Sequence, residues 1–590
     1  MTATPGLADA ADSRNESAPR PGARPRSRAR WVLPDPADPE AVRALAAELH
    51  LPEPVCRLLC ARGYLSPDDA KHFLRPRLEY LNDSGGMLGL DRAVERLARA
   101  ARGGETVLVH GDYDVDGICS TALLTRALRT FGARVVPFIP RRLEDGYDLT
   151  EAGVRAALAA GATVVVTCDC GTSAREPIAR LCEAGVDVIV SDHHLPGGPL
   201  PECLAVLNPK RDGCDYPDKD LAAVGVAFKL ALALAKALGV ADAFIFRMLD
   251  LVALATVADI APLRGENRVL VRYGLRMLNE TRNVGLRALV RAAGLEGKAL
   301  TAGRAGFILA PRLNAVGRLG HALRGVELLL TDDEREAEVI AAELEELNRR
   351  RQELDRATLE EARRLVDALD LDATYGVVLA AEGWHPGVIG IVASRIVEEI
   401  SRPTVLVALK DGEGKGSGRS ISRFDLHAGL AECHDLLVRF GGHRSAAGVT
   451  IAAERVGEFA ERFNAVARAR LAAEDLVPEL RVDLEVPLAA VTPELEAMLR
   501  HFEPCGVGNA SPLLVTRGVR VAAPPRPLRN GGARVRLTQD GAALEALAWG
   551  LGAEVAALRP GELIDVAYRL ERDEWRGESY LQARLVDVHR

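Results

Sequence analysis

The stretch of sequence that decides the fold reads VLVHGDYDVDG, from Val107 to Gly117. A strand-like apolar run leads into three carboxylates at alternate positions, Asp112, Asp114 and Asp116, and a helix is expected to begin near Ile118. Carboxylates this close repel one another and raise one another's pKa, and a bound divalent cation removes that cost. An EF-hand loop would need Glu at its twelfth position, which here is Leu123. The stretch therefore predicts a metal site of another kind at the end of a buried strand.

The same pattern of a buried strand followed by an acid occurs twice more. Asp169 follows the apolar run of Val164–Thr172, and Asp192, His193 and His194 follow that of Val188–His194. Asp259 adds an acid within a further apolar segment. A single Asp at a strand end is usually a cap or turn residue. Ligands of open α/β sheets bind outside the carboxyl ends of the strands, however, so these strand ends are expected to converge on one crevice.

The chain around these strands alternates between short apolar runs and helical segments, which is typical of a parallel sheet in an α/β domain. A helical region precedes them. Residues 331–365 contain neither Gly nor Pro and carry a narrow apolar stripe, so they are expected to form one long helix connecting two domains. A second α/β region follows at about 374–465. After about 478, five short alternating strands predict an OB-like β-barrel. The predicted strands are Thr106–His110, Arg134–Ile139, Thr163–Thr167 and Val186–Val190 in the first sheet, Tyr375–Ala380 and Thr404–Ala408 in the second, and Leu514–Val521, Ala533–Thr538, Leu544–Leu551, Leu563–Leu570 and Tyr580–Val588 in the barrel.

A chain of 590 residues is longer than one hydrophobic core usually organises. The N-terminal residues are rich in Ala, Pro, Ser and Arg and predict a disordered tail, with a weak phosphate-binding arm as the alternative. The proposed segments are a disordered Arg/Pro-rich tail (1–35), a helical region (36–103), an α/β catalytic domain (104–330), the connecting helix (331–365), a second α/β domain (366–470) and a nucleic-acid-binding barrel (471–590).

Bulk composition constrains the class of protein. The formal net charge of −8 lowers the expectation of a protein that coats nucleic acid by charge alone, so any such role must rest on local basic patches or on metal-bridged phosphates. The ten cysteines lack the paired spacing of zinc sites and are expected to be reduced thiols of a cytoplasmic protein. No apolar run approaches the roughly 20 residues that span a bilayer, so no membrane association is expected.

Several of these segments resemble the motifs of the DHH phosphoesterase superfamily. Asp192-His193-His194 matches its name-giving triplet, and His110–Asp116 resembles its first motif. Within the superfamily the similarity is greatest to the RecJ family of exonucleases and covers about 80–590. The supporting segments are Cys168–Thr172, Pro311–Arg318, Glu382–Gly390, Gly441–Gly448, which is similar to the Gly-Gly-His signature of the DHH-associated domain, and Pro504–Asn509.

The resemblance implies two Mn²⁺ or Mg²⁺ ions. The ligands that it implies are Asp114, Asp116, Asp169, His193 and Asp259, with Asp169 as the bridge. Asp112 would be a ligand or would contact one, and His110 would orient its neighbours. Imidazole among carboxylates shifts the preference from Mg²⁺ toward Mn²⁺. Such a pair of ions activates water and stabilises charge on the phosphoryl oxygens, while His194 would stabilise the transition state or donate a proton, or alternatively orient a ligand.

In the second α/β domain, Gly414–Ser420 is interpreted as a small, flexible, basic loop whose amides can approach a phosphate. It lacks the spacing of a Walker loop, and a Gly-rich hairpin tip is the alternative. The resemblance implies that this region holds a terminal 5′-phosphate through Ser417 and Arg419. The other candidate nucleic-acid contacts are Arg141, Arg312, Asn314, Arg318, His385, Gly441, Gly442 and His443.

The implied activity is 5′→3′ exonucleolytic hydrolysis of single-stranded DNA in repair and recombination, by a monomer that cooperates with a helicase and a single-strand-binding protein. The barrel would supply a stacking and electrostatic platform. One alternative is hydrolysis of short oligonucleotides or cyclic dinucleotides, but DHH relatives of that kind generally lack the barrel. Another is a catalytically inactive DNA-binding replication factor, against which the intact Asp and His set argues.

Overall fold

The computed structural model describes residues 29–142, 144–528, 531–575 and 578–590. The described chain divides into two compact units. The first unit consists of residues 33–346 and 482–590, and the second consists of residues 347–481 together with 29–32. No helix within the described ranges combines the length and the apolar character needed to cross a bilayer. All ten cysteines are free thiols, as expected.

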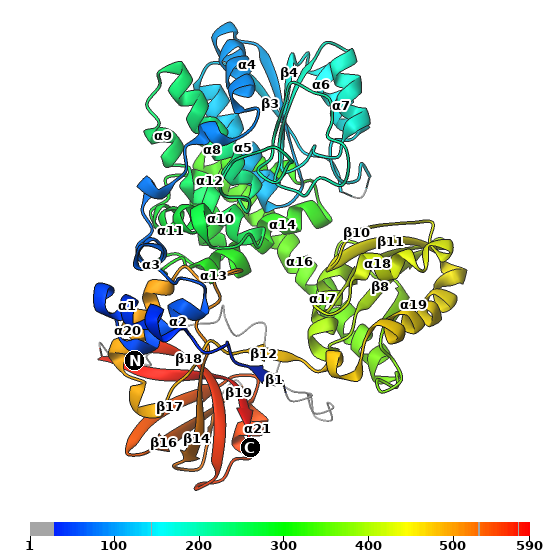
Figure 1. Cartoon of the computed structure of the whole chain (residues 1–590). Coiled ribbons are helices and arrows are strands. Elements are labelled where there is room, and N and C mark those ends of the chain that lie inside the picture. Colours follow the sequence, from blue (N-terminus) through cyan, green and yellow to red (C-terminus); the bar gives the residue numbers. More distant parts are fainter. Residues whose placement is uncertain (1–28, 143, 529–530, 576–577) are drawn as a thin grey trace, which may run out of the picture. The chain divides into compact units, whose positions relative to one another are not determined.

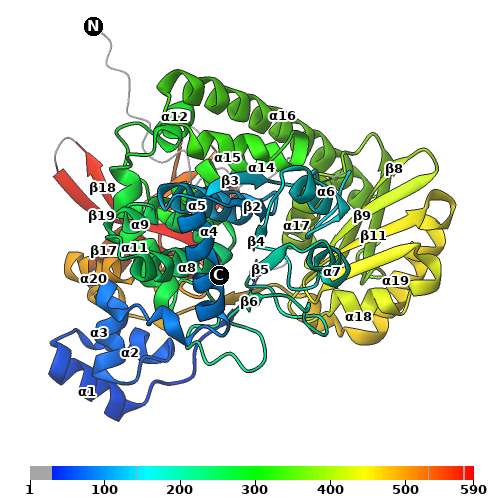
Figure 2. The ribbon, with the colours of Figure 1, turned by 90° about the horizontal axis from the view of Figure 1, so that it is seen from above.

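A five-stranded parallel sheet organises the first unit, in the order β3-β2-β4-β5-β6. Its strands are β2 (Thr106–Gly111), β3 (Arg134–Phe138), β4 (Val164–Cys168), β5 (Asp187–Ser191) and β6 (Ala205–Leu207). The central strands are buried because helices cover both faces of the sheet. Helices α4 (Leu90–Gly103), α5 (Val115–Thr130) and α8 (Ala223–Leu238) lie on one face, and α6 (Glu151–Ala159) and α7 (Arg175–Glu183) lie on the other (Figures 1 and 2). The predicted α/β class is confirmed, with the three-residue edge strand β6 as an addition.

A group of helices follows the sheet in the chain. Its members are α9 (Ala243–Phe246), α10 (Leu249–Ala258), α11 (Gly265–Asn279), α12 (Val284–Ala292), α13 (Ala302–Arg304), α14 (Ala310–Leu319) and α15 (Leu323–Leu330). A π-helical turn, Ala305–Leu309, joins α13 to α14. Pro311 lies just beyond this turn, and since proline has no N–H to offer the carbonyl of Phe307, the wider turn is accommodated there.

The C-terminal part of the first unit is a closed barrel. Five strands follow one another in the order β14-β18-β19-β17-β16, and β16 pairs back with β14. They are β14 (Leu514–Val521), β16 (Ala533–Gln539), β17 (Ala542–Ala548), β18 (Leu563–Trp575) and β19 (Glu578–His589), and the short strands β13 (Leu484–Glu485) and β15 (Arg526–Pro527) flank them. All five barrel strands were expected from the alternation of apolar residues, so the barrel prediction is confirmed.

The N-terminal helices α1 (Pro39–Leu49), α2 (Glu53–Ala61) and α3 (Pro67–Leu74) share a hydrophobic core with this barrel and with α20 (Pro493–Leu499). Within it the rings of Phe73 and Phe502 meet edge to face, with centroids 5.3 Å apart. The sequence proposal treated the helical region and the barrel as separate segments, whereas they bury their apolar side chains in one core.

Arg268 of α11 ties these parts together. The residue is 2% exposed, and its guanidinium carbon lies 4.0 Å from the centre of the Phe73 ring. Its N–H groups donate to five backbone carbonyls at 2.7–3.2 Å, those of Phe73, His501, Phe502, Glu503 and Pro504. The segment His501–Pro504, which leads into the Pro504–Asn509 motif, therefore fastens the barrel region to α11.

The second unit contains a mixed sheet in the order β10-β11-β9-β8-β7. Its strands are β7 (Val377–Glu382), β8 (Thr404–Lys410), β9 (Glu413–Arg419), β10 (Arg439–His443) and β11 (Ala446–Ala452). The long helix α16 (Glu334–Asp367) begins in the first unit and ends in the second, which confirms the predicted long helix. The last turns of α16 and helix α17 (Ile389–Ile400) pack on one face of the sheet, and α18 (Leu426–Ala431) and α19 (Val456–Arg470) pack on the other.

The prediction of a flexible basic loop at Gly414–Ser420 is wrong. These residues belong mainly to β9, which lies in the sheet between β8 and β11. Gly416 faces a packed core, where an added Cβ would lie 2.5 Å from Cγ2 of Val449. The alternate glycines are there because no side chain fits, and Ser417 and Arg419 point to the opposite face of the strand.

The N-terminal end of the described chain also differs from the expectation. Residues Arg30–Val32 form β1, which pairs in parallel with β12 (Glu479–Arg481). The last part of the predicted disordered tail is therefore a strand. The other arginines of the tail, at positions 14, 20, 24, 26 and 28, lie outside the described residues.

Candidate metal centre

The first two carboxylates follow β2 directly. Asp114 is the N-cap of α5, and its Oδ1 accepts hydrogen bonds from the backbone N of Asp116 at 2.9 Å and of Gly117 at 3.1 Å. Glycine is required at 117, because an added Cβ would lie 2.5 Å from the backbone N of Asp112. The three alternating acids thus lie in a tight turn between β2 and α5, in which the backbone of Gly117 passes close to that of Asp112.

Asp116 lies in the first turn of α5 and is buried. Its two carboxylate oxygens accept hydrogen bonds from the backbone N of Ala223 and of Val224, both at 2.8 Å. These amides belong to the first turn of α8, whose positive dipole end favours a negative charge. The helix fixes the direction of the carboxylate.

Asp169 follows β4 in a left-handed conformation, with φ of 65°. Asp tolerates this region better than most residues because its short polar side chain can bond locally. The carboxylate is buried, and its Oδ1 lies 3.2 Å from Nε2 of His193. The tight turn places the carboxylate over the ends of β4 and β5.

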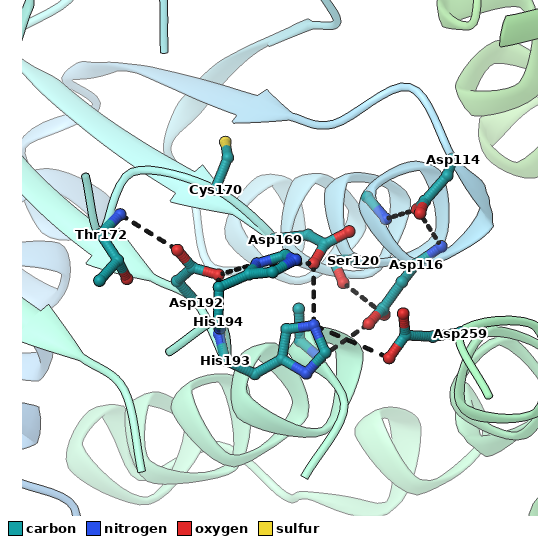
Figure 3. A network of polar contacts seen from close by, with 12 residues as sticks. Asp114, Asp116, Ser120, Asp169, Cys170, Thr172, Asp192, His193, His194 and Asp259 are labelled. Atoms are coloured by element: carbon teal, nitrogen blue, oxygen red, sulfur yellow. Dashed lines mark hydrogen bonds and ion pairs between the residues drawn. The ribbon is translucent and has the colours of Figure 1, made fainter. Parts of the chain in front are cut away.

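Asp192 orients the two imidazoles that follow it (Figure 3). Its Oδ1 accepts from the backbone N of His193 at 2.7 Å and lies 2.8 Å from Nδ1 of His194, while its Oδ2 accepts from the backbone N of Thr172 at 3.0 Å. Sequence reasoning missed this role, although an Asp that bonds the amides after it is a known turn device.

Three groups of side chains place their ligand atoms within 4.8 Å of one another: Asp112, Asp114 and Asp169; Asp169, His193 and His194; and Asp116, His193 and Asp259. Asp169 and His193 each belong to two of them. The seven residues come from the ends of three strands, from α5 and from the end of α10. Side chains from the three strand ends therefore lie close together, as the sequence predicts.

The donor atoms of this cluster fit a divalent cation. Asp112 Oδ1, Asp169 Oδ1 and His193 Nε2 are buried and have no hydrogen-bond partner among the described residues. Asp169 Oδ1 and His193 Nε2 are close together without a hydrogen bond between them. Buried polar atoms are seldom left unpaired, and carboxylate oxygen with imidazole nitrogen is a donor set that Mn²⁺ and Mg²⁺ accept.

Electrostatics support the same conclusion. Burial, and after it the charge of neighbouring carboxylates, raises the pKa of Asp116 to about 7 and of Asp259 to about 8. The pKa of Asp112 and of Asp169 is raised well above the ordinary value for the same reasons. Burial lowers the pKa of His193 to about 3, which keeps its imidazole neutral and able to bind metal. A bound cation would reverse the cost of ionising these acids.

His194 has the opposite character. Burial alone would lower its pKa, but the hydrogen bond and the charge of Asp192 outweigh burial and raise it to about 9. The pKa of Asp192 is lowered in turn: burial opposes this, and the bond to His194 prevails. His194 therefore carries a proton near neutral pH in the metal-free protein.

Other predicted residues of the first unit lie elsewhere. His110 is buried, and its Nδ1 lies 3.5 Å from Sγ of Cys170. Gly153 packs directly against the His110 ring, where a larger side chain would not fit. Arg312 was expected to contact nucleic acid, but its guanidinium is buried and pairs with Glu345 of α16, so that expectation is not supported. Asn314 accepts from the backbone N of Val115 at 3.2 Å and supports the turn into α5.

The two remaining arginines occupy more open positions. Arg141 is exposed, and its guanidinium lies 3.0 Å from Glu144. Arg318 is half-buried on α14, next to Gly317, where an added Cβ would lie 2.2 Å from the carbonyl oxygen of Tyr113. Helix α14 thus packs closely on the turn that carries Asp112 and Asp114.

Tyr147 and Tyr113 are site neighbours that sequence reasoning missed. The Tyr147 hydroxyl lies 3.3 Å from Nδ1 of His194, and its ring meets that of Tyr113 edge to face. Arg142 stacks over Tyr113 at 4.8 Å. These residues lie in the turn after β2 and in the irregular connection between β3 and α6, where no periodic pattern could indicate them.

In the second unit, Ser417 and Arg419 lie together at the first turn of α17. Nη1 of Arg419 donates to Oγ of Ser417 at 3.1 Å. An added Cβ on Gly390 would lie 2.9 Å from that Oγ and 3.0 Å from Nη2 of Arg419. His385 lies just before α17 and accepts from the backbone N of Gly387 at 3.0 Å. A hydroxyl, a guanidinium and a helix N-terminus are together suited to an anion.

The segment Gly441–His443 lies on β10, the edge strand of the sheet in this unit. Gly442 has φ of 138°, and an added Cβ would lie 2.4 Å from the carbonyl oxygen of Ala446. Its backbone geometry therefore requires glycine, and the small residues leave the backbone of this edge exposed.

Three family profiles match the chain. The DHH family N-terminal domain matches residues 106–256, the DHHA1 domain matches residues 373–469, and the RecJ OB domain matches residues 482–587. The first covers the strand ends of the candidate metal centre and reaches Thr256, near the end of α10, and the second and third correspond to the mixed sheet and the closed barrel.

Relatives that match nearly the whole chain agree with these three domain matches. The single-stranded-DNA-specific exonuclease RecJ of Bacillus subtilis is 36% identical over 95% of this chain and 71% of its own length. The enzyme of the same description from Thermus thermophilus is 38% identical over 96% of this chain and 79% of its own length. The crystal structure of Thermus thermophilus RecJ in complex with Mn²⁺ is similar with a TM-score of 0.82 and 35% identity, over 95% of this chain and 80% of that chain. A second structure of that protein, in complex with Mg²⁺, gives a TM-score of 0.77.

Proposed function

This chain belongs to the RecJ family of single-stranded-DNA-specific exonucleases, and from that premise we propose that it hydrolyses single-stranded DNA from the 5′ end toward the 3′ end. The observation that carries the proposal is the cluster of buried Asp and His donors at the strand ends, in a chain similar to RecJ along nearly its whole length. An enzyme that hydrolyses only short oligonucleotides would not need the closed barrel. A DNA-binding factor without catalytic activity would not need the complete set of Asp and His donors.

The residues that would hold two Mn²⁺ or Mg²⁺ ions are Asp114, Asp116, Asp169, His193 and Asp259, with Asp112 beside them. Membership of Asp169 in two of the three groups supports its assignment as the bridge. When bound, such ions supply an activated water and stabilise charge on the phosphoryl oxygens.

The protein's own groups complete the chemistry. Asp192 holds Nδ1 of His194 at 2.8 Å, so the ring presents a fixed face and keeps its proton. His194 can stabilise negative charge that develops on the phosphoryl group or donate a proton to the departing sugar oxygen. The turn amides that hold Asp114 and Asp116 keep the carboxylates in place during the reaction.

The 5′ end would be recognised in the second unit. Ser417, Arg419 and the first turn of α17 together offer donors suited to an anion, and we assign the terminal 5′-phosphate to them. Arg141 and Arg318 are the further candidates from the first unit.

The barrel would hold the following part of the strand. Arg520, Arg526, Arg534 and Arg536 are exposed on β14, β15 and β16, and Arg526 and Arg534 are direct cross-strand neighbours. Like charges in that position repel unless an anion lies between them, which supports a phosphate-binding face. A role in DNA repair and recombination, a cytoplasmic site of action, a monomeric state and cooperation with a helicase and a single-strand-binding protein complete the proposal.

End-labelled DNA tests this function. We expect release of mononucleotides from the 5′ end of single strands, little cleavage of blunt duplexes, faster cleavage with a 5′-phosphate, and no cleavage after chelation of Mn²⁺ and Mg²⁺. Arg419→Ala should remove the advantage of the 5′-phosphate, while the matched control Arg423→Ala, at an exposed position nearby, should keep it. Degradation from the 3′ end, or of dinucleotides only, would overturn the proposal.

A further inference from the structure

A buried ion pair that holds none of the donor atoms joins α8 to α11. Lys229 of α8 and Glu266 at the start of α11 have side chains that are 1% and 2% exposed, and Nζ of Lys229 lies 2.6 Å from Oε1 of Glu266. Taking both charges out of water can cost more free energy than their attraction returns, and apolar residues of similar volume often serve a fold as well. The pair therefore needs an explanation other than stability alone.

Hydrogen bonds extend the ion pair into a network, named the buried network, that consists of Asn82, Tyr216, Asp218, Lys229 and Glu266. The backbone N of Asn82 donates to Oε1 of Glu266 at 2.7 Å, and its carbonyl accepts from Nζ of Lys229 at 2.7 Å. The hydroxyl of Tyr216 donates to Oε2 of Glu266 at 2.6 Å, and Oδ2 of Asp218 accepts from the backbone N of Glu266 at 2.7 Å. The buried network thus fixes the segment that precedes α8 against the start of α11.

The segment that precedes α8 supports two of the metal donors. It runs from Tyr216 to the first turn of α8, where two backbone N–H groups donate to the carboxylate of Asp116, both at 2.8 Å. The backbone of Leu221, within the same segment, makes a hydrogen bond with the imidazole of His193. A shift of this segment would therefore move the supports of Asp116 and His193 together.

The buried network also holds the connection that follows a third donor, Asp259. Glu266 is the seventh residue after Asp259, so the chain between them is short. The adjacent Asn267 is buried, and its Nδ2 donates to the carbonyl of Asp220 at 2.6 Å and to that of Pro262 at 3.1 Å. The connection from Asp259 to α11 is thus tied to the segment that precedes α8.

These three donors, Asp116, His193 and Asp259, form one of the three groups whose ligand atoms lie within 4.8 Å of one another (Figure 3). We propose that Lys229 and Glu266 are positioning residues for this group. Their ion pair sets the distance between the segment that precedes α8 and the connection that follows α10, and so prepares one cation position of the metal centre. The inference rests on the proposed function and adds to it the residues that shape the site before a cation binds.

The donors of the other cation position have different support. Asp114 is held by the amides of the turn after β2, and Asp112 lies in the same turn. Across the described parts of the chain, no hydrogen bond links either carboxylate to the buried network. A weakened network should therefore affect one cation and spare the other, which a general loss of stability would not do.

Lys229→Met tests the proposal through metal binding alone. Calorimetric titration of the metal-free protein with Mn²⁺ should show two binding events in wild type. In the variant one event should weaken about tenfold while the other keeps its affinity. The matched control is Arg96→Met, because Arg96 is also a buried cation between two carboxylates, but it lies at the N-terminal ends of the strands, opposite the metal centre. This control should lower Tm and leave both Mn²⁺ affinities unchanged.

Tyr216→Phe is a milder variant that answers the same question if Lys229→Met does not fold. It keeps the ring and removes one hydroxyl from the buried network, so the same Mn²⁺ event should weaken about threefold. The Mn²⁺ concentration that gives half the maximal cleavage rate should rise by the same factor, while the maximal rate stays close to that of wild type. Unchanged Mn²⁺ affinities in Tyr216→Phe, equal weakening of both events, or the same effect in Arg96→Met would overturn the inference. Failure of the wild-type protein to bind two Mn²⁺ ions or to cleave single strands would instead refute the proposed function.

Discussion

At the scale of single residues, Asp169 shows how burial and neighbouring carboxylates act together on one acid. It is buried, belongs to two of the three donor groups, and has its pKa raised by burial and then by Asp114, Asp116, Asp112 and Asp259. At neutral pH the metal-free protein must either ionise it at a cost or keep it protonated. The residue is therefore unfavourable for the fold and favourable for cation binding.

Asp169→Asn should separate these two effects. Asn fits the same left-handed backbone, so the metal-free variant should be more stable by about 1–2 kcal/mol, because the free-energy cost of burying an ionisable carboxyl is gone. The stabilisation of wild type by saturating Mn²⁺, about 2.7 kcal/mol at one hundred times Kd, should be lost. Thermal unfolding with and without Mn²⁺ measures both quantities.

Asp540→Asn is the control for this substitution, because Asp540 also has a positive φ, of 46°, but lies in a turn of the barrel. It should leave the response to Mn²⁺ intact. A metal-free Asp169→Asn protein that is less stable than wild type, or one that still responds to Mn²⁺, would contradict the assignment.

At the scale of elements, β9 shows how local composition can mislead. Its alternating glycines look like a flexible loop in isolation, but they are the core-facing positions of an inner strand whose neighbours fill the space.

Gly416→Ala should destabilise the protein by about 1–3 kcal/mol, because the added Cβ meets Val449 and Val407. Gly448→Ala on the adjacent β11 is the control, since its nearest atom would lie 3.9 Å away, and it should be nearly neutral. Equal denaturant midpoints for the two variants would refute the packing argument.

An ion-pair cluster at the N-terminal ends of the strands of the first sheet can be tested by changing the pH. Arg96 of α4 lies 2.7 Å from Glu105, just before β2, and also pairs with Asp187 at the start of β5. The hydrogen bond from Arg96 is the main reason that the pKa of Glu105 lies below its usual 4.5. A lowered pKa means stabilisation that is present above the unfolded-state pKa and lost as pH falls through the folded-state value.

Glu105→Gln should therefore cost about 1 kcal/mol at pH 7, and the difference from wild type should shrink as the pH falls below the usual glutamate pKa of 4.5. Glu95→Gln, an exposed position on α4, changes the charge equally and should cost little at any pH. Urea unfolding of the three proteins between pH 7 and pH 3 provides the measurement. If the difference in unfolding free energy between Glu105→Gln and wild type stays constant with pH, ionised Glu105 is not what stabilises these strand ends.

The elements that sequence predicted best were those with their own period or composition. Strands such as β2 and β4 are apolar runs of the right length, and the barrel strands alternate in register. The acids and imidazoles of the site could be foreseen because parallel strands end at one edge of a sheet. The roles of Asp192 and Tyr147 were missed, because each depends on hydrogen bonds in a turn or connection that has no periodic pattern.

At the scale of the whole molecule, Arg268 is the residue on which the assembly of the first unit depends. All five of its N–H groups are used by carbonyls of two segments distant in sequence. Arg268→Met should destabilise the protein by about 3–5 kcal/mol, since it leaves several buried carbonyls unpaired. Arg268→Lys should be nearly as harmful, because an ammonium cannot reproduce the planar fork.

Arg272→Met is the control, since Arg272 donates to the carbonyl of Glu503 from a more exposed position one turn later. It should cost about 1 kcal/mol. The free energy of unfolding in guanidinium chloride is the measurement. A loss for Arg268→Met no larger than that of Arg272→Met would mean that the barrel region is held in place without the arginine.

The core shared by the N-terminal helices and the barrel also determines when these helices can complete their folding during synthesis. Phe73 and Phe502 touch in the finished protein although about 430 residues separate them in the chain. At about 5–20 residues per second, a ribosome needs roughly 20–90 s to make the second partner after the first. During that interval α2 and α3 have no surface on which to bury Val55, Leu59 and Phe73. Helices α2 and α3 are thus made well before the barrel and yet reach their native packing only after it, so nascent chains that stop short of the barrel expose apolar surface that chaperones and proteases recognise.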